Sequence, residues 1–157
     1  MGPAPAQGWT LIELVSVVAI LAIVAAIAAP RSVDRSAFTA RAYAAEVAGA
    51  ARLARAIALA SGCSVRLTID PPGYRARQQP AAPNGHCDRG AASYPTAVRR
   101  SDGSMLQGAR PHDVALSGNA QWTFHPDGTV AITGNAALGF GSLTVAIDPA
   151  TGIASGP

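Results

Sequence analysis

Lysine is absent from this 157-residue sequence, and aromatic residues make up only 5% of it. All twelve basic residues are arginine, and they are dispersed, with Arg99-Arg100 as the one adjacent pair. A nucleic-acid-binding chain would gather its basic residues on one face or in a run, so the pattern argues against that class. Because alanine and glycine supply much of the apolar content, any core has to be built from small side chains.

The sequence also lacks the residue patterns of catalytic and metal sites. No serine or cysteine lies in a nucleophile motif, and no two carboxylates have a catalytic spacing. Cys63 and Cys87 could join His86 and His112 as ligands, but their spacing is not the paired-ligand pattern of a metal site. We therefore expect no enzymatic activity, no metal and no cofactor.

The two cysteines are better explained as a disulfide than as ligands, provided that the chain is exported. A cytosolic chain would keep Cys63 and Cys87 as free thiols, whereas an oxidising compartment favours their pairing. The bond would close a loop of about 25 residues and contribute roughly 3–4 kcal/mol in the chain-entropy model.

Four stretches of different composition follow one another along the chain. Met1–Gly8 is a short polar leader, and Trp9–Ala29 is almost purely apolar. Pro30–Ser61 is alanine-rich and dotted with arginine, and Gly62–Pro157 is rich in glycine, proline and threonine. A helix over the apolar stretch would rise about 30 Å, the thickness of a bilayer core, which predicts a transmembrane helix.

The third stretch has helical spacing. One narrow apolar face carries Tyr43, Val47, Ala50, Ala54 and Ile57, with Leu53 at its edge. Arg41, Arg52 and Arg55 fall on the opposite face, which we interpret as solvated. Gly62 is the expected C-terminal stop of this amphipathic helix.

After Gly62 the period becomes alternating, which predicts short strands and turns. The expected strands are Ser64–Ile69, one beginning at Tyr74, Gln121–His125, Thr129–Thr133 and Ser142–Ile147. Trp122 and Phe124 lie two apart, so they share a sheet face and are predicted core residues, while His125 is expected at a strand end. We expect 78–111 to be loop.

Glu13 is the unusual residue of the apolar stretch, because a carboxylate at mid-membrane costs about 2.5–3.5 kcal/mol. If the chain is cut after Gly8, the new amine of Trp9 lies near the depth of Glu13, and a neighbouring subunit's amine can neutralise the carboxylate. An ordinary secretory signal, with a cleavage site at Ala26-Ile27-Ala28, is one alternative. A plain membrane anchor is another, and it leaves Glu13 unexplained.

The segment Gly8-Trp9-Thr10-Leu11-Ile12-Glu13-Leu14 resembles the prepilin processing motif of type IV pilins and pseudopilins. Tryptophan stands where the motif usually has phenylalanine. The resemblance implies that a prepilin peptidase cuts between Gly8 and Trp9 and methylates the new amine of Trp9. It also implies that Glu13 is the assembly carboxylate and that Pro30 kinks the helix.

Further segments resemble minor pilins of the mannose-sensitive haemagglutinin (MSHA) type, and others are similar to the H-type pseudopilin and FimT class. The MSHA-like segments are Pro30–Arg41, Gly62–Arg66 and Gly73-Tyr74; the H-type and FimT-like ones are Phe124–Gly128 and Thr151-Gly152. The resemblance implies a head of two small antiparallel sheets.

The expected fold is therefore α+β, with a long N-terminal helix whose second half packs on a β-rich head. The expected function is that of a structural minor pilin or pseudopilin. It would be held in the bacterial inner membrane with its head in the periplasm, and would then join other pilins in a type IV pilus-like filament or prime the assembly of that filament. A type II secretion pseudopilin and a DNA-binding minor pilin for transformation stay open as alternatives. The segment Thr151–Gly156 lacks the arginines of DNA-binding relatives, whereas Arg99, Arg100 and Arg110 keep that alternative open.

Overall fold

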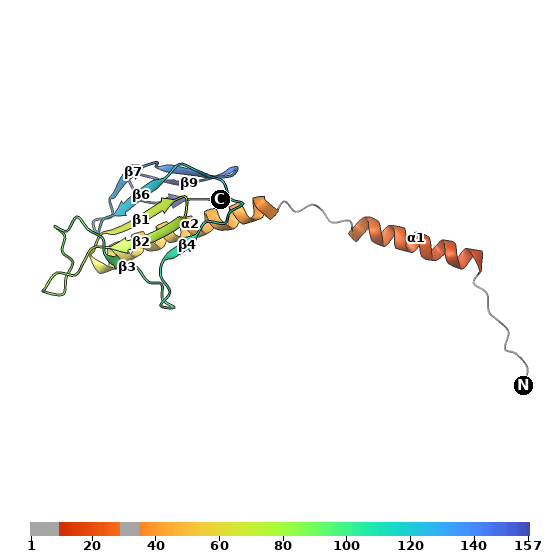
Figure 1. Cartoon of the computed structure of the whole chain (residues 1–157), viewed down its shortest axis with the longest axis horizontal. Coiled ribbons are helices and arrows are strands. Elements are labelled where there is room, and N and C mark those ends of the chain that lie inside the picture. The colour runs from red at the N-terminus through yellow and green to blue at the C-terminus, as the bar shows by residue number, and fades with distance from the viewer. Residues whose placement is uncertain (1–9, 29–34) are drawn as a thin grey trace, which may run out of the picture. The chain divides into compact units, whose positions relative to one another are not determined.

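The chain forms two compact units, Met1–Val33 and Asp34–Pro157. The computed structural model describes residues 10–28 and 35–157, with the backbone alone for 26–28 (Figure 1). The predicted processing residues Gly8 and Trp9 and the predicted kink residue Pro30 lie outside these ranges.

The described part of the first unit is helix α1, Leu11–Ala28. Its 18 residues rise about 27 Å. The predicted transmembrane helix runs from Trp9 to Ala29, two residues that are not described. Among the helices that the structure describes, none combines the length and the apolar character needed to cross a membrane.

Helix α2, Arg35–Ser61, begins the second unit and provides one wall of its core. The helix was expected from Pro30, but its described part starts five residues later. It ends as predicted, because Gly62 has a φ of 69° and donates its N–H to the Ala58 oxygen at 3.1 Å. A positive φ just beyond the last turn is the helix stop that glycine makes without steric cost.

The described part of the second unit has ten strands, and they form two antiparallel sheets that pack with α2. The six-stranded sheet has the order β3-β2-β1-β6-β7, with β4 also paired to β2, and the four-stranded sheet has the order β10-β9-β8-β5. The strands of the first sheet are β1 Val65–Asp70, β2 Gly73–Gln78, β3 Thr96–Ala97, β4 Gln107–Ala109, β6 Ala120–Phe124 and β7 Val130–Gly134. Those of the second are β5 Leu116–Ser117, β8 Ala137–Phe140, β9 Leu143–Ile147 and β10 Ala154–Ser155. The α+β class and the two sheets are therefore confirmed.

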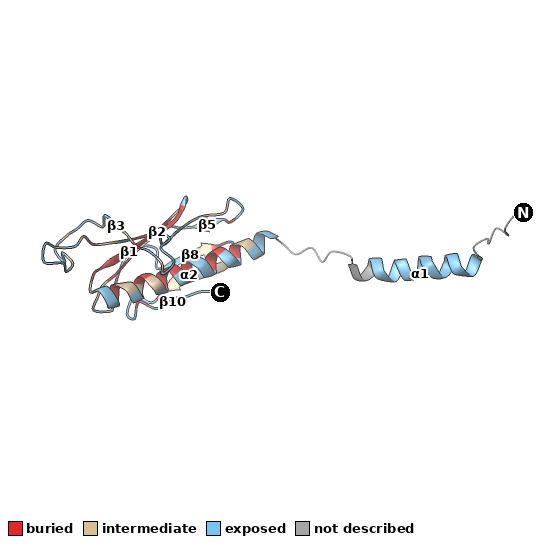
Figure 2. Cartoon of the chain, turned by 90° about the horizontal axis from the view of Figure 1, so that it is seen from below, coloured by how far each residue is buried: buried red, intermediate tan, exposed pale blue. Residues whose placement is uncertain are grey.

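The hydrophobic core lies between α2 and the two sheets, and the buried side of the helix is visible in Figure 2. Trp122 and Phe124 are 0% and 1% exposed, as their shared face predicted. The buried face of α2 is wider than the predicted seam, since it adds Ala40, Ala44, Ala48, Ala51 and Ala58. Alanine at these positions lets the strands approach the helix closely, so a core of small side chains can still be closely packed.

Two expectations for the head hold only in part. The stretch 78–111 is not all loop, because β3 and β4 lie within it and pair with β2. The arginine side of α2 is not simply solvated either. Arg52 Nε donates to the Ala154 oxygen at 3.2 Å, and Arg55 is half-buried beside Gly152. The Arg52 donor and the aliphatic stem of Arg55 hold the C-terminal strand against the helix, while Arg55 Nε is buried without a hydrogen-bond partner among the described residues.

Candidate functional site

Helix α1 exposes apolar side chains on every side. Its large side chains are 41–82% exposed, and successive ones are separated by one or two positions. They are Leu11, Ile12, Leu14, Val15, Val17, Val18, Ile20, Leu21, Ile23 and Val24. At about 100° per residue these positions cover the whole circumference, which is typical of a helix surrounded by other apolar helices or by lipid. This helix is the candidate assembly surface.

Glu13 lies in the first turn of that helix. Its N–H donates to the Thr10 oxygen at 3.1 Å, and its own carbonyl accepts from the Ser16 hydroxyl at 2.9 Å. Its carboxylate has no hydrogen-bond or ion-pair partner in residues 10–28 and 35–157. A negative charge is favourable in the first turn, where it meets the positive end of the helix dipole.

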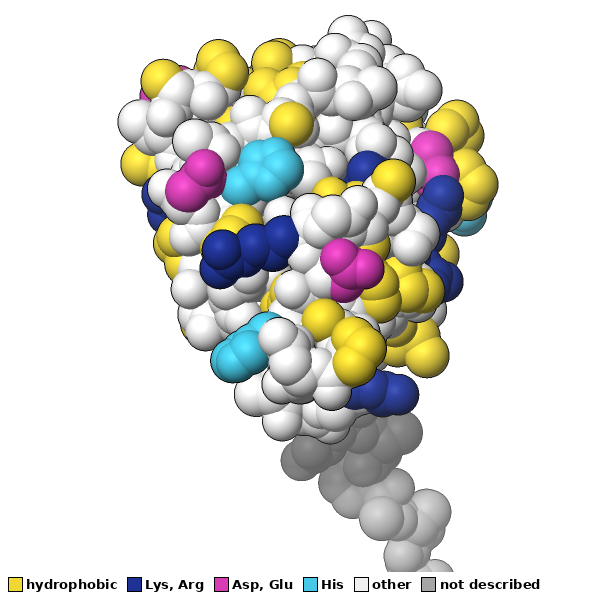
Figure 3. Space-filling view, turned by 90° about the vertical axis from the view of Figure 1, so that its left-hand side faces the viewer, with side chains coloured by type: hydrophobic (Ala, Val, Ile, Leu, Met, Phe, Trp, Pro, Cys, Tyr) yellow, Lys and Arg dark blue, Asp and Glu magenta, His cyan; other side chains and the backbone are white. Residues whose placement is uncertain are grey.

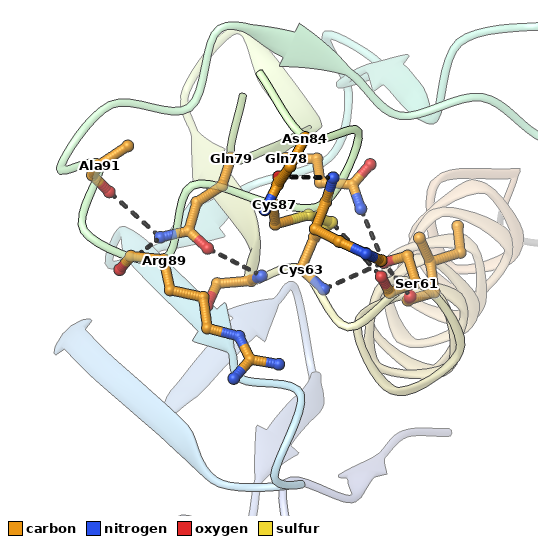
Figure 4. The surroundings of a disulfide bond; sticks show 11 residues. Ser61, Cys63, Gln78, Gln79, Asn84, Cys87, Arg89 and Ala91 are labelled. Atoms are coloured by element: carbon orange, nitrogen blue, oxygen red, sulfur yellow. Dashed lines mark hydrogen bonds between the residues drawn. A yellow bond between two sulfur atoms is a disulfide. The ribbon is translucent and has the colours of Figure 1, made fainter. Parts of the chain in front are cut away.

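Cys63 and Cys87 form the predicted disulfide, with a Cα–Cα distance of 5.3 Å. The bond ties the loop after β2 to the end of α2 (Figure 4). Gln78 adds a second tie, because its Nε2 donates to the Ser61 hydroxyl at 2.7 Å. No group of side chains in the described part of the chain has the composition of a metal site.

A polar cluster that sequence reasoning missed joins α2, β2 and the turn before β4. The Tyr74 hydroxyl donates to Glu46 Oε1 at 2.5 Å and accepts from Arg100 Nη2 at 2.9 Å. Burial, followed by the hydrogen bond to Glu46, raises the pKa of the Tyr74 hydroxyl well above its ordinary value. No motif signals this cluster, because its members come from segments far apart in the sequence.

Tyr43 lies next to that cluster but has no such partner. Its ring is 6.2 Å from that of Tyr74 and packs edge-on against Phe140 at 5.5 Å. The hydroxyl is buried without a hydrogen-bond partner among the described residues. Burial, with the charge of Glu46 as the second cause, raises the pKa of Tyr43 to about 12. Both tyrosine hydroxyls stay protonated at physiological pH, so neither acts as a titrating group. Their role in the head is structural.

The loop arginines that kept a DNA-binding role open are occupied within the head. Arg99, Arg100 and Arg110 each donate to a backbone carbonyl oxygen of the head, at 2.7, 3.0 and 2.7 Å respectively. Arg100 also serves the Tyr74 cluster. These side chains are therefore positioned by contacts within the head.

A family model described as type II transport protein GspH matches residues 43–154, from α2 to β10. The match covers well over half of the chain, and it contains both sheets and the disulfide. The chain therefore belongs to the GspH family, which is of the pseudopilin class. No curated protein and no solved structure matches it significantly.

Proposed function

We propose that this chain is a structural minor subunit of a type IV pilus-like filament, with the pseudopilus of a type II secretion system as the filament. The observation that carries the proposal is α1, which is apolar on every side and belongs to a different compact unit from the head. Such a helix needs apolar neighbours, and identical or related helices of other subunits supply them. The finer assignment to an MSHA-type minor pilin rests on residue resemblance alone.

In this proposal a prepilin peptidase cuts between Gly8 and Trp9 and methylates the new amine. The apolar segment that contains α1 holds the subunit in the inner membrane before assembly, with the head in the periplasm. The Cys63–Cys87 disulfide supports that location, since structural disulfides persist in oxidising compartments. The partners are other pilins or pseudopilins.

Glu13 selects the axial offset between the helices of neighbouring subunits by pairing with the amine of Trp9 in the adjacent subunit. A carboxylate in apolar surroundings is costly when unpaired, and an opposite charge offsets that cost only at one axial offset between helices. The partnerless carboxylate in the first turn of α1 is the observation behind this step.

The test compares Glu13→Gln with Glu13→Asp in cells. Both variants are expected to be processed and to form the disulfide, because the head has its own core. Glu13→Gln should be depleted from sheared filaments relative to the membrane pool, whereas Glu13→Asp, which keeps the charge, should retain part of its incorporation. Intact mass of the extracted wild type should correspond to a chain that starts at N-methyl-Trp9. A mature chain that starts near Ala29, or equal incorporation of Glu13→Gln and wild type, would contradict the proposal.

A further inference from the structure

A polar pocket of about 630 Å³ opens at the end of the head where α2 finishes. Figure 3 views that end, where arginine, histidine and acidic side chains lie near one another. Its lining comes from the residue before β1, the loop of the disulfide and the turn after β6: Ser64, Arg89, His125, Pro126, Asp127 and Thr129. Cavities of this size hold small ligands or a side chain of another protein.

The floor of the pocket is a serine–histidine pair, of which the serine is buried and the histidine half-buried. Ser64 is 5% exposed, and its Oγ lies 3.1 Å from His125 Nδ1. When the serine hydroxyl donates to Nδ1, the neutral ring carries its proton on Nε2. The half-buried ring then has one donor left for a ligand.

Arg89 forms the facing wall, and its backbone is held at two points. Cys87, two residues earlier, is bonded to Cys63, and the Arg89 oxygen accepts from Gln79 Nε2 at 3.5 Å. The Gln79 side chain also accepts from the Ser64 N–H at 3.1 Å, which connects the wall to the floor (Figure 4). The Arg89 guanidinium has no partner in the part of the chain that the structure describes. Figure 4 shows it extending away from the disulfide.

Asp127 limits the negative charge of the ligands that the pocket can accept. Its Oδ1 accepts from the Thr129 hydroxyl at 2.7 Å and from the Thr129 N–H at 2.9 Å. These two bonds lower the pKa of Asp127, so it remains a carboxylate at neutral pH. One cation, Arg89, and one anion, Asp127, therefore line the same pocket, and a ligand with a single negative charge is favoured over a dianion.

We propose that this pocket binds a carboxylate, with the fork of Arg89 and Nε2–H of His125 as donors. A guanidinium meets both oxygens of a carboxylate with two parallel hydrogen bonds. A phosphate dianion would bring a second negative charge beside Asp127. The carboxylate can belong to a small acid or to an acidic side chain of a partner polypeptide, and the pocket is large enough for either. The inference stands independently of filament assembly, because α1 supplies none of the lining.

The experiment titrates the full chain in detergent micelles with sodium acetate, with a neutral-ended tripeptide containing one aspartate, and with inorganic phosphate. The side-chain NMR signals of His125 are followed, and those of His112, which lies outside the pocket, are the internal control. Acetate and the tripeptide should shift His125 saturably, and phosphate should bind more weakly. Tighter binding of the tripeptide than of acetate assigns the site to a polypeptide, and equal binding assigns it to a small acid.

Arg89→Gln should weaken both carboxylate ligands by at least about tenfold, the loss expected when a charge-assisted bidentate contact is removed. The matched control, Arg99→Gln, removes an arginine from an exposed turn and should leave binding unchanged. Cys63→Ala with Cys87→Ala should also weaken binding, since the wall is then held by Gln79 alone. No saturable shift of His125, equal effects of the two arginine variants, or tighter binding of phosphate than of acetate would overturn the proposal.

Discussion

Two neighbouring tyrosines allow the Glu46–Tyr74–Arg100 cluster to be tested by one matched pair of substitutions. Tyr43→Phe and Tyr74→Phe each delete a single hydroxyl from a ring that is 2% exposed. The Tyr74 hydroxyl makes two hydrogen bonds to ionised groups, whereas the Tyr43 hydroxyl has no partner among the described residues. The two variants therefore differ in hydrogen bonding and scarcely in packing.

The solvent exposure of Glu46 and Arg100 determines how much stability Tyr74→Phe should lose. A hydrogen bond to a charged group is worth about 1.5–3 kcal/mol when its loss leaves a buried charge unpaired. The side chains of Glu46 and Arg100 are 47% and 31% exposed, so both regain water when the hydroxyl is removed. We expect Tyr74→Phe to lower the free energy of unfolding by about 1–2 kcal/mol. Tyr43→Phe should change it by less than about 0.5 kcal/mol, or raise it.

The assay is urea unfolding of the segment from Asp34 to Pro157, which contains the whole described core. Adding Glu46→Gln makes a double-mutant cycle, in which Tyr74→Phe should cost less because the charged acceptor is already gone. Equal losses for the two tyrosine variants, or strict additivity of Tyr74→Phe with Glu46→Gln, would refute the reasoning.

Three further predictions concern the same unit. Removing the disulfide by Cys63→Ala with Cys87→Ala should lower the free energy of unfolding in urea by roughly 3–4 kcal/mol, and a loss below 1 kcal/mol would contradict the loop-closure argument. Gly108→Ala should destabilise by about 1–3 kcal/mol, because its Cβ would lie 2.6 Å from a tyrosine ring atom. Gly49→Ala, in open space on α2, should stabilise by about 0.5–1 kcal/mol. Thermal melts of the two glycine variants test both predictions, and a change of the opposite sign in either variant would contradict the reasoning. The raised pKa of Tyr43 adds stability that is complete below pH 10 and lost as the pH rises from 10 to about 12. Across that window the free energy of unfolding should fall with pH more steeply in the wild type than in Tyr43→Phe, by about 1.4 kcal/mol per pH unit. Equal slopes for the two proteins would contradict the prediction.

The parts of the fold that depend on local chemistry were predictable from the sequence. The end of α2 at Gly62 and the hairpin around Pro126-Asp127-Gly128 follow from residues that favour one backbone conformation. The disulfide needed only two cysteines and an oxidising compartment. The apolar character of α1 and the position of Glu13 were also predictable from the sequence, because a carboxylate interrupts an otherwise apolar run.

The parts that depend on distant pairing were not predictable. Strands β5 and β10 are two residues long, and β8 contains a glycine, so none of them has an alternating pattern to detect. The pairing of β1 with β6 joins segments about fifty residues apart, which no local signal encodes. The partners of Tyr74 and the pocket wall at Arg89 likewise become neighbours only when the sheets close on α2.

The contact between the last strand and α2 also constrains the order of folding. The carbonyl of Ala154 accepts from Arg52, and a Cβ at Gly156 would lie 2.8 Å from that of Ala48, so the helix face is completed by residues made about a hundred positions later. Until those residues are in place, that side of α2 lacks its final cover. Non-local closure of this kind folds slowly, on the scale of about milliseconds to seconds. The head therefore acquires its final form only after its whole length is free, as a single late event and not in stages from the N-terminus.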